Sequence, residues 1–218
     1  MTKNTTILGI DISKDSFDVY DQVKGHGQFI NAPKGFAAFF KTLDLNSWVV
    51  MEATGSYHHR LALYLFEKGV SVSVVNPLVV KRFIQMKLNR VKTDKSDARM
   101  ICSYGLQQEL EPWSPDPEYV AQCKEMQGVV QVYFKQRTAL KNKLHSLQSK
   151  GLVKGTVITC LKRQLRHLDK EIAFLEEKME ALIKTHEPDL FRRIKSIPRT
   201  GKENSHGVDC FHQRIQGL

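Results

Sequence analysis

The chain has 218 residues, 41% of them hydrophobic and 26% charged. That apolar share is enough for a packed core and excludes a wholly disordered chain. Lysine and arginine number 33 against 23 acids, and the resulting net charge of +10 favours a polyanionic partner such as nucleic acid. No apolar run approaches the roughly 20 residues of a membrane-spanning helix, and no signal peptide is recognisable. Four widely spaced cysteines fit neither a zinc site nor a disulfide framework and indicate a reducing cytosol.

Residues 6–106 alternate between strand and helix patterns. Strands are predicted at 6–12 and 17–23, and a third begins at Gly27 after a glycine turn. A helix follows Pro33, and strands at 47–53 and 71–75 enclose a helix that Gly69 ends. Further helices are predicted from Pro77 and over 93–106. This order predicts an α/β fold, a mixed sheet with flanking helices on the plan of ribonuclease H-like domains, over residues 1–110.

The second half of the chain has a different pattern. The proline-rich stretch 111–117 is predicted as a linker, because its three prolines cannot continue a helix. Over 118–190, apolar residues recur at steps of three and four, first in 126–147 and then in 158–182, where the seam spans about 36 Å. These basic, coiled-coil helices either fold back as a hairpin or pair with another chain. We favour self-association into a homo-oligomer, because a two-helix hairpin has little core of its own.

Four acids stand out by position. Asp11 ends the first strand and Glu52 ends the strand at 47–53, whereas Asp94 and Asp97 lie three apart at a helix start. Strand ends are where open α/β sheets place their sites, so these carboxylates are predicted to converge. Clustered carboxylates repel one another unless a cation neutralises them, and hard oxygen ligands suit Mg²⁺.

Plainer interpretations of the acids remain open. A strand-end acid taken alone is more often a turn residue or helix cap, and Asp94 and Asp97 can simply complement a helix dipole. Three nearby acids, Asp15, Asp18 and Asp21, are predicted to be exposed.

A family resemblance is carried by four segments: GIDISKDSFDVY, VVMEATGSYHHRLALYLFEKG, VSVVNPLVVKRF and KTDKSDARMIC. Together they resemble the DEDD-type insertion-sequence transposases, a family that includes the Piv and MooV DNA invertases and RNA-guided recombinases. The resemblance covers roughly residues 6–198. It implies a RuvC-like catalytic domain that uses Mg²⁺ or Mn²⁺, with DNA and a guide RNA as partners, at the bacterial nucleoid. The implied metal ligands and catalytic residues are Asp11, Glu52, Asp94 and Asp97.

The end of the chain departs from the family pattern. The family continues into a domain that begins at a segment similar to IKSIPGIG and supplies a serine nucleophile. Here IKSIPRTG leads into a tail without apolar periodicity, so residues 191–218 are expected to be the truncated start of that domain with an aberrant tail. Ser205 lies in no recognisable motif. We therefore expect the chain to complete no strand exchange alone, and its own enzymatic activity stays open.

Two functions compete at this point. The first is a transposase or site-specific recombinase polypeptide acting on DNA, and the alternative is a non-enzymatic remnant that binds nucleic acid or a partner copy. An actin-like phosphotransferase is disfavoured, because no later glycine-rich phosphate segment follows. From 135 to 170 the chain has ten basic residues and one acid. The predicted phosphate contacts are Lys81, Arg82, Lys87, Arg90, Lys135, Arg137, Lys141, Lys143, Arg163 and Arg166.

Overall fold

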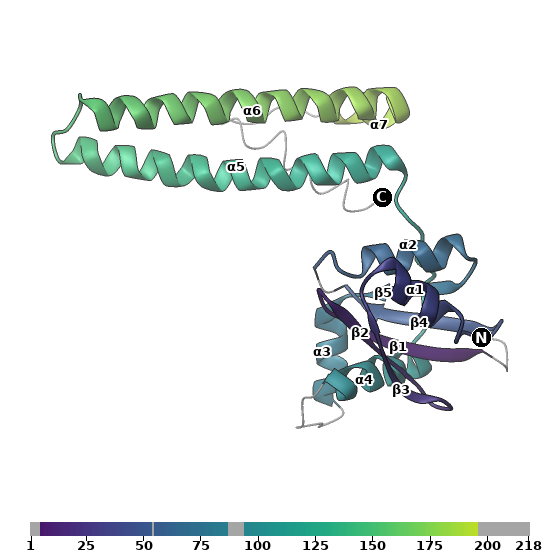
Figure 1. Ribbon diagram of the computed structural model, residues 1–218. Helices are drawn as coiled ribbons and strands as arrows, with labels where there is room; N and C mark the ends of the chain where they lie inside the picture. The colour runs from purple at the N-terminus through teal and green to yellow at the C-terminus, as the bar shows by residue number, and fades with distance from the viewer. Residues whose placement is uncertain (1–4, 54, 87–93, 196–218) are drawn as a thin grey trace. The chain divides into compact units, whose positions relative to one another are not determined.

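The computed structural model describes residues 5–53, 55–86 and 94–195, and the chain divides into two compact units, Met1–Pro115 and Asp116–Leu218 (Figure 1). The first unit contains β1 (Thr6–Ile12), β2 (Ser16–Asp21), β3 (Gly25–Ile30), α1 (Pro33–Phe40), β4 (Ser47–Glu52), α2 (His59–Glu67), β5 (Ser71–Val75), α3 (Pro77–Met86) and α4 (Asp94–Gln107). The second unit contains α5 (Glu118–Ser149), α6 (Thr156–His186) and α7 (Pro188–Lys195).

The five strands form one mixed sheet in the order β3-β2-β1-β4-β5. β2 runs antiparallel to both β1 and β3, whereas β4 is parallel to both β1 and β5. Tight turns suffice for the antiparallel pairs, and the parallel pairs need connections that contain helices. The sheet confirms the α/β class and the mixed strand directions predicted from the order of the elements.

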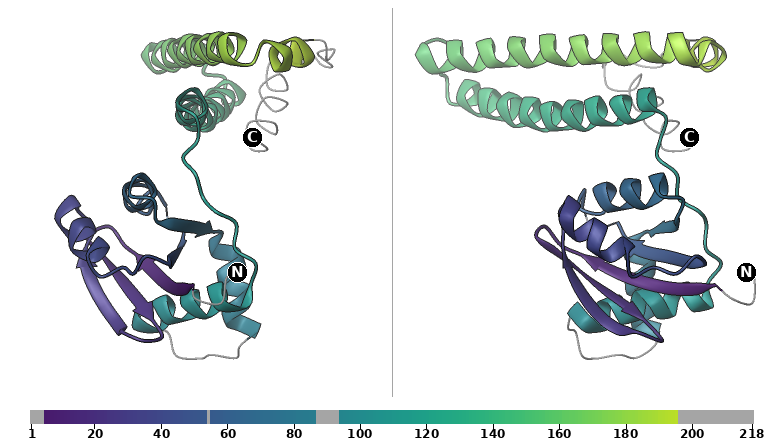
Figure 2. Two further views of the ribbon diagram at one scale, coloured as in Figure 1. Left: turned by 90° about the vertical axis from the view of Figure 1, so that its right-hand side faces the viewer. Right: turned by 45° about the vertical axis from the view of Figure 1, so that its right-hand side comes forward.

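Both faces of the sheet are covered by helices (Figure 2). On one face, Leu8 and Ile10 of β1 pack with buried side chains of α1 and α2, among them Phe39. On the other face, Ile7 packs with side chains of α3 and α4, among them Ile101. Alternate residues of a strand point to opposite faces, so the apolar run of β1 supplies both cores.

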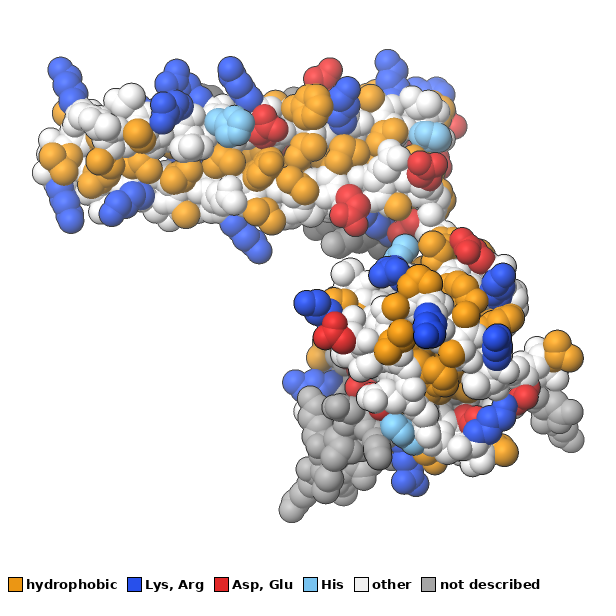
Figure 3. Space-filling view, in the orientation of Figure 1, with side chains coloured by type: hydrophobic (Ala, Val, Ile, Leu, Met, Phe, Trp, Pro, Cys, Tyr) orange, Lys and Arg blue, Asp and Glu red, His pale blue; other side chains and the backbone are white. Residues whose placement is uncertain are grey.

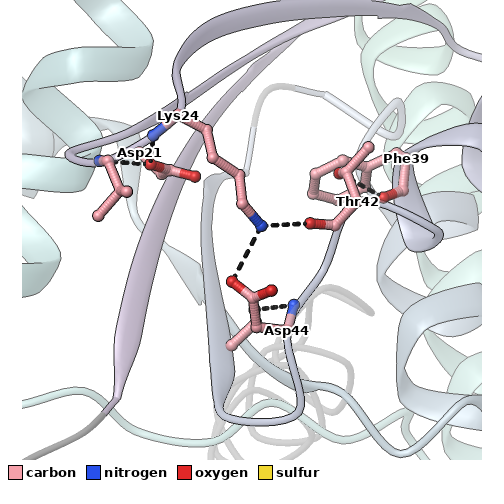
Figure 4. Close-up of polar contacts among 7 residues, drawn as sticks. Asp21, Lys24, Phe39, Thr42 and Asp44 are labelled. Atoms are coloured by element: carbon pink, nitrogen blue, oxygen red, sulfur yellow. Dashed lines mark hydrogen bonds and ion pairs between the residues drawn. The ribbon is translucent and has the colours of Figure 1, made fainter.

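The turn between β2 and β3 is built around Asp21, which is 3% exposed. Its Oδ1 atom accepts hydrogen bonds from the backbone amides of Val23, at 2.6 Å, and Lys24 (Figure 4). The Lys24 ammonium donates to the Thr42 carbonyl at 2.7 Å and pairs with Asp44 at 2.9 Å. The prediction that Asp21 is exposed was wrong, because its carboxylate folds back onto backbone amides of the turn.

The first part of the proline-rich stretch lies along β5. Ser73 donates its hydroxyl proton to the Glu111 carbonyl at 2.6 Å, and the Trp113 amide donates to the Val72 carbonyl at 2.7 Å. The Trp113 ring packs against the core under α1 and α2 and contacts His59 edge-on. The Trp113 bond occupies a backbone carbonyl of an edge strand that would otherwise be open to pairing.

The helices α5 and α6 lie side by side in opposite directions (Figure 1). Near one end, the Tyr119 hydroxyl donates to Glu187 Oε1 at 3.0 Å, and its ring stacks on His186 at 4.5 Å. Further along, Arg137 Nε lies 3.0 Å from Asp169 Oδ1, close enough for an ion pair. Of the two arrangements left open by the sequence, the hairpin is therefore the one present within the chain.

Burial along this hairpin is uneven. Away from the connection between the helices, Cys123, Val130 and Ile172 belong to a buried cluster. Towards the connection, Ile158 and Leu168 are buried. Five other leucines of the predicted seam are only half-buried: Leu140, Leu144, Leu147, Leu161 and Leu165. Figure 3 shows apolar side chains in a band along the line where the two helices meet. Two helices alone leave the edges of their apolar seam open to solvent. Among the described helices, none is both long enough and apolar enough to span a membrane.

Candidate functional site

The carboxyl ends of β1 and β4 bring Asp11 and Glu52 to the same edge of the sheet. The parallel register pairs Ile10 with Met51, so the residues that follow, Asp11 and Glu52, are also neighbours. Side chains of neighbours in register point to the same face. This is the face of Ile7, which is covered by α3 and α4. Both acids are partly buried there.

Helix α4 reaches this edge because β1 has a glycine where the two elements meet. A Cβ atom on Gly9 would overlap the carbonyl oxygen of Ala98 and the amide nitrogen of Cys102, so a side chain has no room there. Further along α4, a Cβ on Gly105 would meet Ile7 at 2.9 Å. The C-terminal half of α4 therefore lies near the start of β1, and its N-terminus points toward the end of the strand, where Asp11 stands.

The acids of α4 are at that N-terminus. Asp97 precedes Ala98 and is partly buried. Asp94 is the first residue of α4, but its side chain lies outside the described part of the structure. Within the described side chains, no three of histidine, cysteine, aspartate and glutamate are spaced to hold one ion. The structure places the ends of β1 and β4 and the start of α4 at the same edge of the sheet. Which of their acids bind a metal ion is a separate question, taken up as a proposal below.

Cys102 shows how closely α4 is packed on the sheet. Its Sγ atom donates to the Ile7 carbonyl at 3.3 Å. Burial raises the pKa of this thiol to about 11. A thiol with that pKa stays protonated at neutral pH, so Cys102 acts as a packing residue and not as a metal ligand or nucleophile.

Asp18 was predicted to be exposed, and the prediction was wrong: it is 7% exposed. Its Oδ1 atom lies 2.6 Å from His26 Nε2, and its Oδ2 accepts a hydrogen bond from Gln28 Nε2 at 3.3 Å. Both partners come from β3, which pairs with β2 on the side away from β1. Asp15, by contrast, is exposed as predicted. Strand pairing between distant residues is what covers Asp18, and local sequence carries no signal of it.

Asn31 connects the two loops that follow the acid-bearing strands. Its Nδ2 atom donates to the carbonyl of Ser13, beyond Asp11, at 2.8 Å and to the carbonyl of Tyr57, beyond Glu52, at 3.4 Å. Its Oδ1 atom is buried and has no hydrogen-bond partner within the described residues. No sequence pattern singles out Asn31, because hydrogen bonds between separate loops leave no local pattern.

His58 and His59 begin α2 near Glu52 in the chain. Burial, with the neighbouring His59 as a second cause, lowers the pKa of His58. His58 is therefore neutral at pH 7, and its ring is suited to hydrogen bonding rather than to ion pairing with phosphate.

The predicted phosphate contacts fall into three groups. On α3, Lys81 and Arg82 are exposed, whereas Lys87 and Arg90 lie outside the described residues. Arg137 of α5 forms an ion pair with Asp169 of α6. The remaining residues are exposed on the halves of α5 and α6 that are nearer to the connection between those helices: Lys135, Lys141, Lys143, Arg163 and Arg166.

Comparison with known proteins decides the family. A sequence model of a family described as transposase, of the DEDD type associated with the insertion sequence IS110, matches residues 8–149. The chain belongs to this transposase family. The matched region takes in β1, β4 and α4, which carry all four acids of the predicted tetrad.

The names of curated relatives agree with this family assignment. The pilin gene-inverting protein of Moraxella bovis is 27% identical over 220 residues, covering 91% of this chain and 63% of the relative. The transposases of IS1111A from Coxiella burnetii and IS1328 from Yersinia enterocolitica are each 24% identical over 91% of this chain. They are covered over 61% and 65% of their lengths. The chain thus spans a little under two thirds of the curated relatives it matches.

Proposed function

We propose that this chain acts on DNA as a metal-dependent transposase or site-specific recombinase polypeptide of an insertion sequence. The observation that carries the proposal is the convergence of Asp11, Glu52 and the N-terminus of α4 at one end of one sheet face. Membership of the transposase family supports it, as do relatives named as transposases and as a gene-inverting protein. The mixed sheet in the order β3-β2-β1-β4-β5 supports a ribonuclease H-like, RuvC-like catalytic domain over 1–110. We propose that 111–117 links this domain to the long helices.

The proposed ligands of Mg²⁺ or Mn²⁺ are Asp11, Glu52, Asp94 and Asp97. Their donor set fits, because all four offer the hard oxygen atoms that these ions prefer. Divalent ions bound there would stabilise negative charge on a phosphodiester and on the leaving oxygen. The chain's own contribution is to hold the strand-end carboxylates in register and, through Gly9, to let α4 pack closely on β1.

An assay of DNA binding and strand cleavage tests the proposal. Duplexes carrying insertion-sequence ends are incubated with the chain, with and without guide RNA, in Mg²⁺ or in EDTA. We expect cleaved strands in Mg²⁺ and none in EDTA, and no completed strand exchange by the chain alone. Binding without cleavage in Mg²⁺ would favour the alternative of a non-enzymatic nucleic-acid-binding protein. Such a polypeptide would work in the bacterial cytoplasm, at the nucleoid.

The exposed cations near the α5–α6 connection are proposed to hold phosphate backbones. Figure 3 shows Lys and Arg side chains projecting from this end of the helical pair. Each such contact releases counterions, so the binding should fall steeply with salt and should not depend on base sequence.

We predict that reversing three of these charges, with Lys141→Glu, Lys143→Glu and Arg163→Glu together, weakens duplex binding at least about 100-fold at low salt. The slope of log affinity against log salt should fall in magnitude by roughly three. Fluorescence anisotropy at several salt concentrations measures both. A control with two reversals, Lys178→Glu and Lys184→Glu, at exposed lysines in the other half of α6, should change little. Equal losses in both variants would contradict a localised surface.

The open edges of the α5–α6 seam support self-association through these predicted coiled-coil helices, over 118–190. Half-buried leucines and exposed apolar residues such as Val132, at 50%, and Phe174, at 52%, would be covered by a second copy. We predict a dimer or larger assembly at micromolar concentration in sedimentation equilibrium. A monomer mass across that range would contradict this part of the proposal.

A further inference from the structure

Asp18 is a nearly buried acid with no part in the predicted tetrad. Burying an ionised carboxylate is costly unless hydrogen bonds or a nearby cation compensate. His26 and Gln28, both on β3, supply hydrogen-bonding groups on one side of it. No lysine or arginine forms an ion pair with Asp18 among the described residues, where its one ion-pair partner is His26.

The strand register places Asp18 beside Asp11. The two residues are directly opposite one another in the antiparallel pairing of β1 with β2. Directly opposed residues lie on the same face, with Cα atoms about 5.5 Å apart in a hydrogen-bonded pair.

That face is the one covered by α4. Two residues further along β2, Tyr20 is opposite Gly9, the residue against which α4 packs. The Tyr20 ring also lies 5.7 Å from the guanidinium carbon of Arg99 of α4. Asp18 and Asp11 therefore share the face on which the tetrad is proposed to assemble.

Two adjacent carboxylates on one partly buried face repel each other, and a divalent cation would relieve that repulsion. Mg²⁺ retains several of its waters, and carboxylates just outside the ligand set accept hydrogen bonds from such waters and orient the ligands. Asp18 lies beside Asp11 and has a carboxylate that can accept hydrogen bonds from metal-bound waters. Its contacts to β3 fix the carboxylate where it stands.

We propose that Asp18, held by His26, is a positioning residue of the metal site. It stabilises a divalent cation at Asp11 without being one of the four ligands. This inference rests on the proposed metal-dependent function.

The test is a titration of the whole chain with Mn²⁺, followed by calorimetry and by the electron paramagnetic resonance signal of the bound ion. Asp18→Asn should weaken Mn²⁺ binding about tenfold, as expected for loss of an outer carboxylate. Asp21→Asn is the matched control, because Asp21 is equally buried on β2 and its replacement keeps an oxygen for the turn amides. It should bind Mn²⁺ like the unchanged chain.

A second pair of variants separates positioning from folding. His26→Gln keeps a hydrogen-bond donor near the place of Nε2 and should retain Mn²⁺ affinity, whereas His26→Leu should lose several-fold. These variants decide the matter even if Asp18→Asn fails to fold, since His26 lies on the edge strand β3.

The outcomes are distinguishable. Normal Mn²⁺ affinity in folded Asp18→Asn, or equal affinity in the two His26 variants, overturns the role of Asp18. If Asp11→Asn nevertheless loses binding, the proposed function stands. No binding by the unchanged chain, or normal binding by Asp11→Asn, overturns both.

Discussion

Asp11→Asn should weaken binding of Mg²⁺ or Mn²⁺ by at least about 100-fold. The substitution is nearly isosteric, but it replaces a charged oxygen donor at the centre of the proposed site with a neutral amide. Loss of an outer partner of a metal ligand typically costs 10- to 100-fold, so loss of a ligand should cost at least the upper value. Asp97→Asn should act in the same direction. Isothermal titration calorimetry with Mn²⁺ measures both.

The control for this experiment is Asp44→Asn. The Asp44 side chain is 61% exposed and pairs with Lys24 far from the acid cluster in sequence and in the sheet (Figure 4). Exposed ion pairs of this kind contribute little, so both metal affinity and stability should be close to those of the unchanged chain. Unaltered Mn²⁺ binding in both Asp11→Asn and Asp97→Asn would show that these acids are not ligands.

Gly9→Ala should destabilise the first unit by about 3 kcal/mol, at the upper end of the usual cost of overpacking. The added methyl group would overlap backbone atoms of Ala98 and Cys102, and backbone cannot move aside as a flexible side chain can. To relieve the overlap, α4 must shift away from β1. Because α4 carries Asp97, the same shift should remove metal binding from the protein that remains folded.

Two glycines provide matched controls. A Cβ on Gly35 would overlap the carbonyl oxygen of Ile30, so Gly35→Ala should destabilise to a similar degree. That clash lies between α1 and β3, so metal affinity of the folded protein should be retained. Gly128 in α5 has open space around it, and Gly128→Ala should stabilise by up to about 1 kcal/mol. Urea unfolding with a parallel Mn²⁺ titration distinguishes the three. Full metal affinity in Gly9→Ala would contradict the placement of α4 at the site.

Local sequence patterns were sufficient to predict the helices and strands and the α/β class of the fold. Each strand of the sheet and each of the helices α1 to α6 was predicted close to its observed position, because alternation and helical spacing are properties of short stretches. The acids at the ends of β1 and β4 were found in the same way. In each case, the sequence pattern and the element that it predicts involve the same few neighbouring residues.

Contacts outside the strand and helix periodicities could not be predicted in this way. Asp18 and Asp21 were expected at the surface, but pairing with β3 and a turn of backbone amides cover them. The ion pair of Arg137 with Asp169, 32 positions later in the chain, was likewise not predicted.

The sequence by itself determined the family, the mixed sheet and the positions of the four acids along the chain. The tertiary structure alone decided how the segments that carry them are placed, because Gly9 of β1 admits the backbone of α4 and parallel register aligns Asp11 with Glu52. It also decided that the two long helices form a hairpin. The physical reason is the same in each case: periodicity records which face of an element is apolar, but only packing fixes what that face lies against.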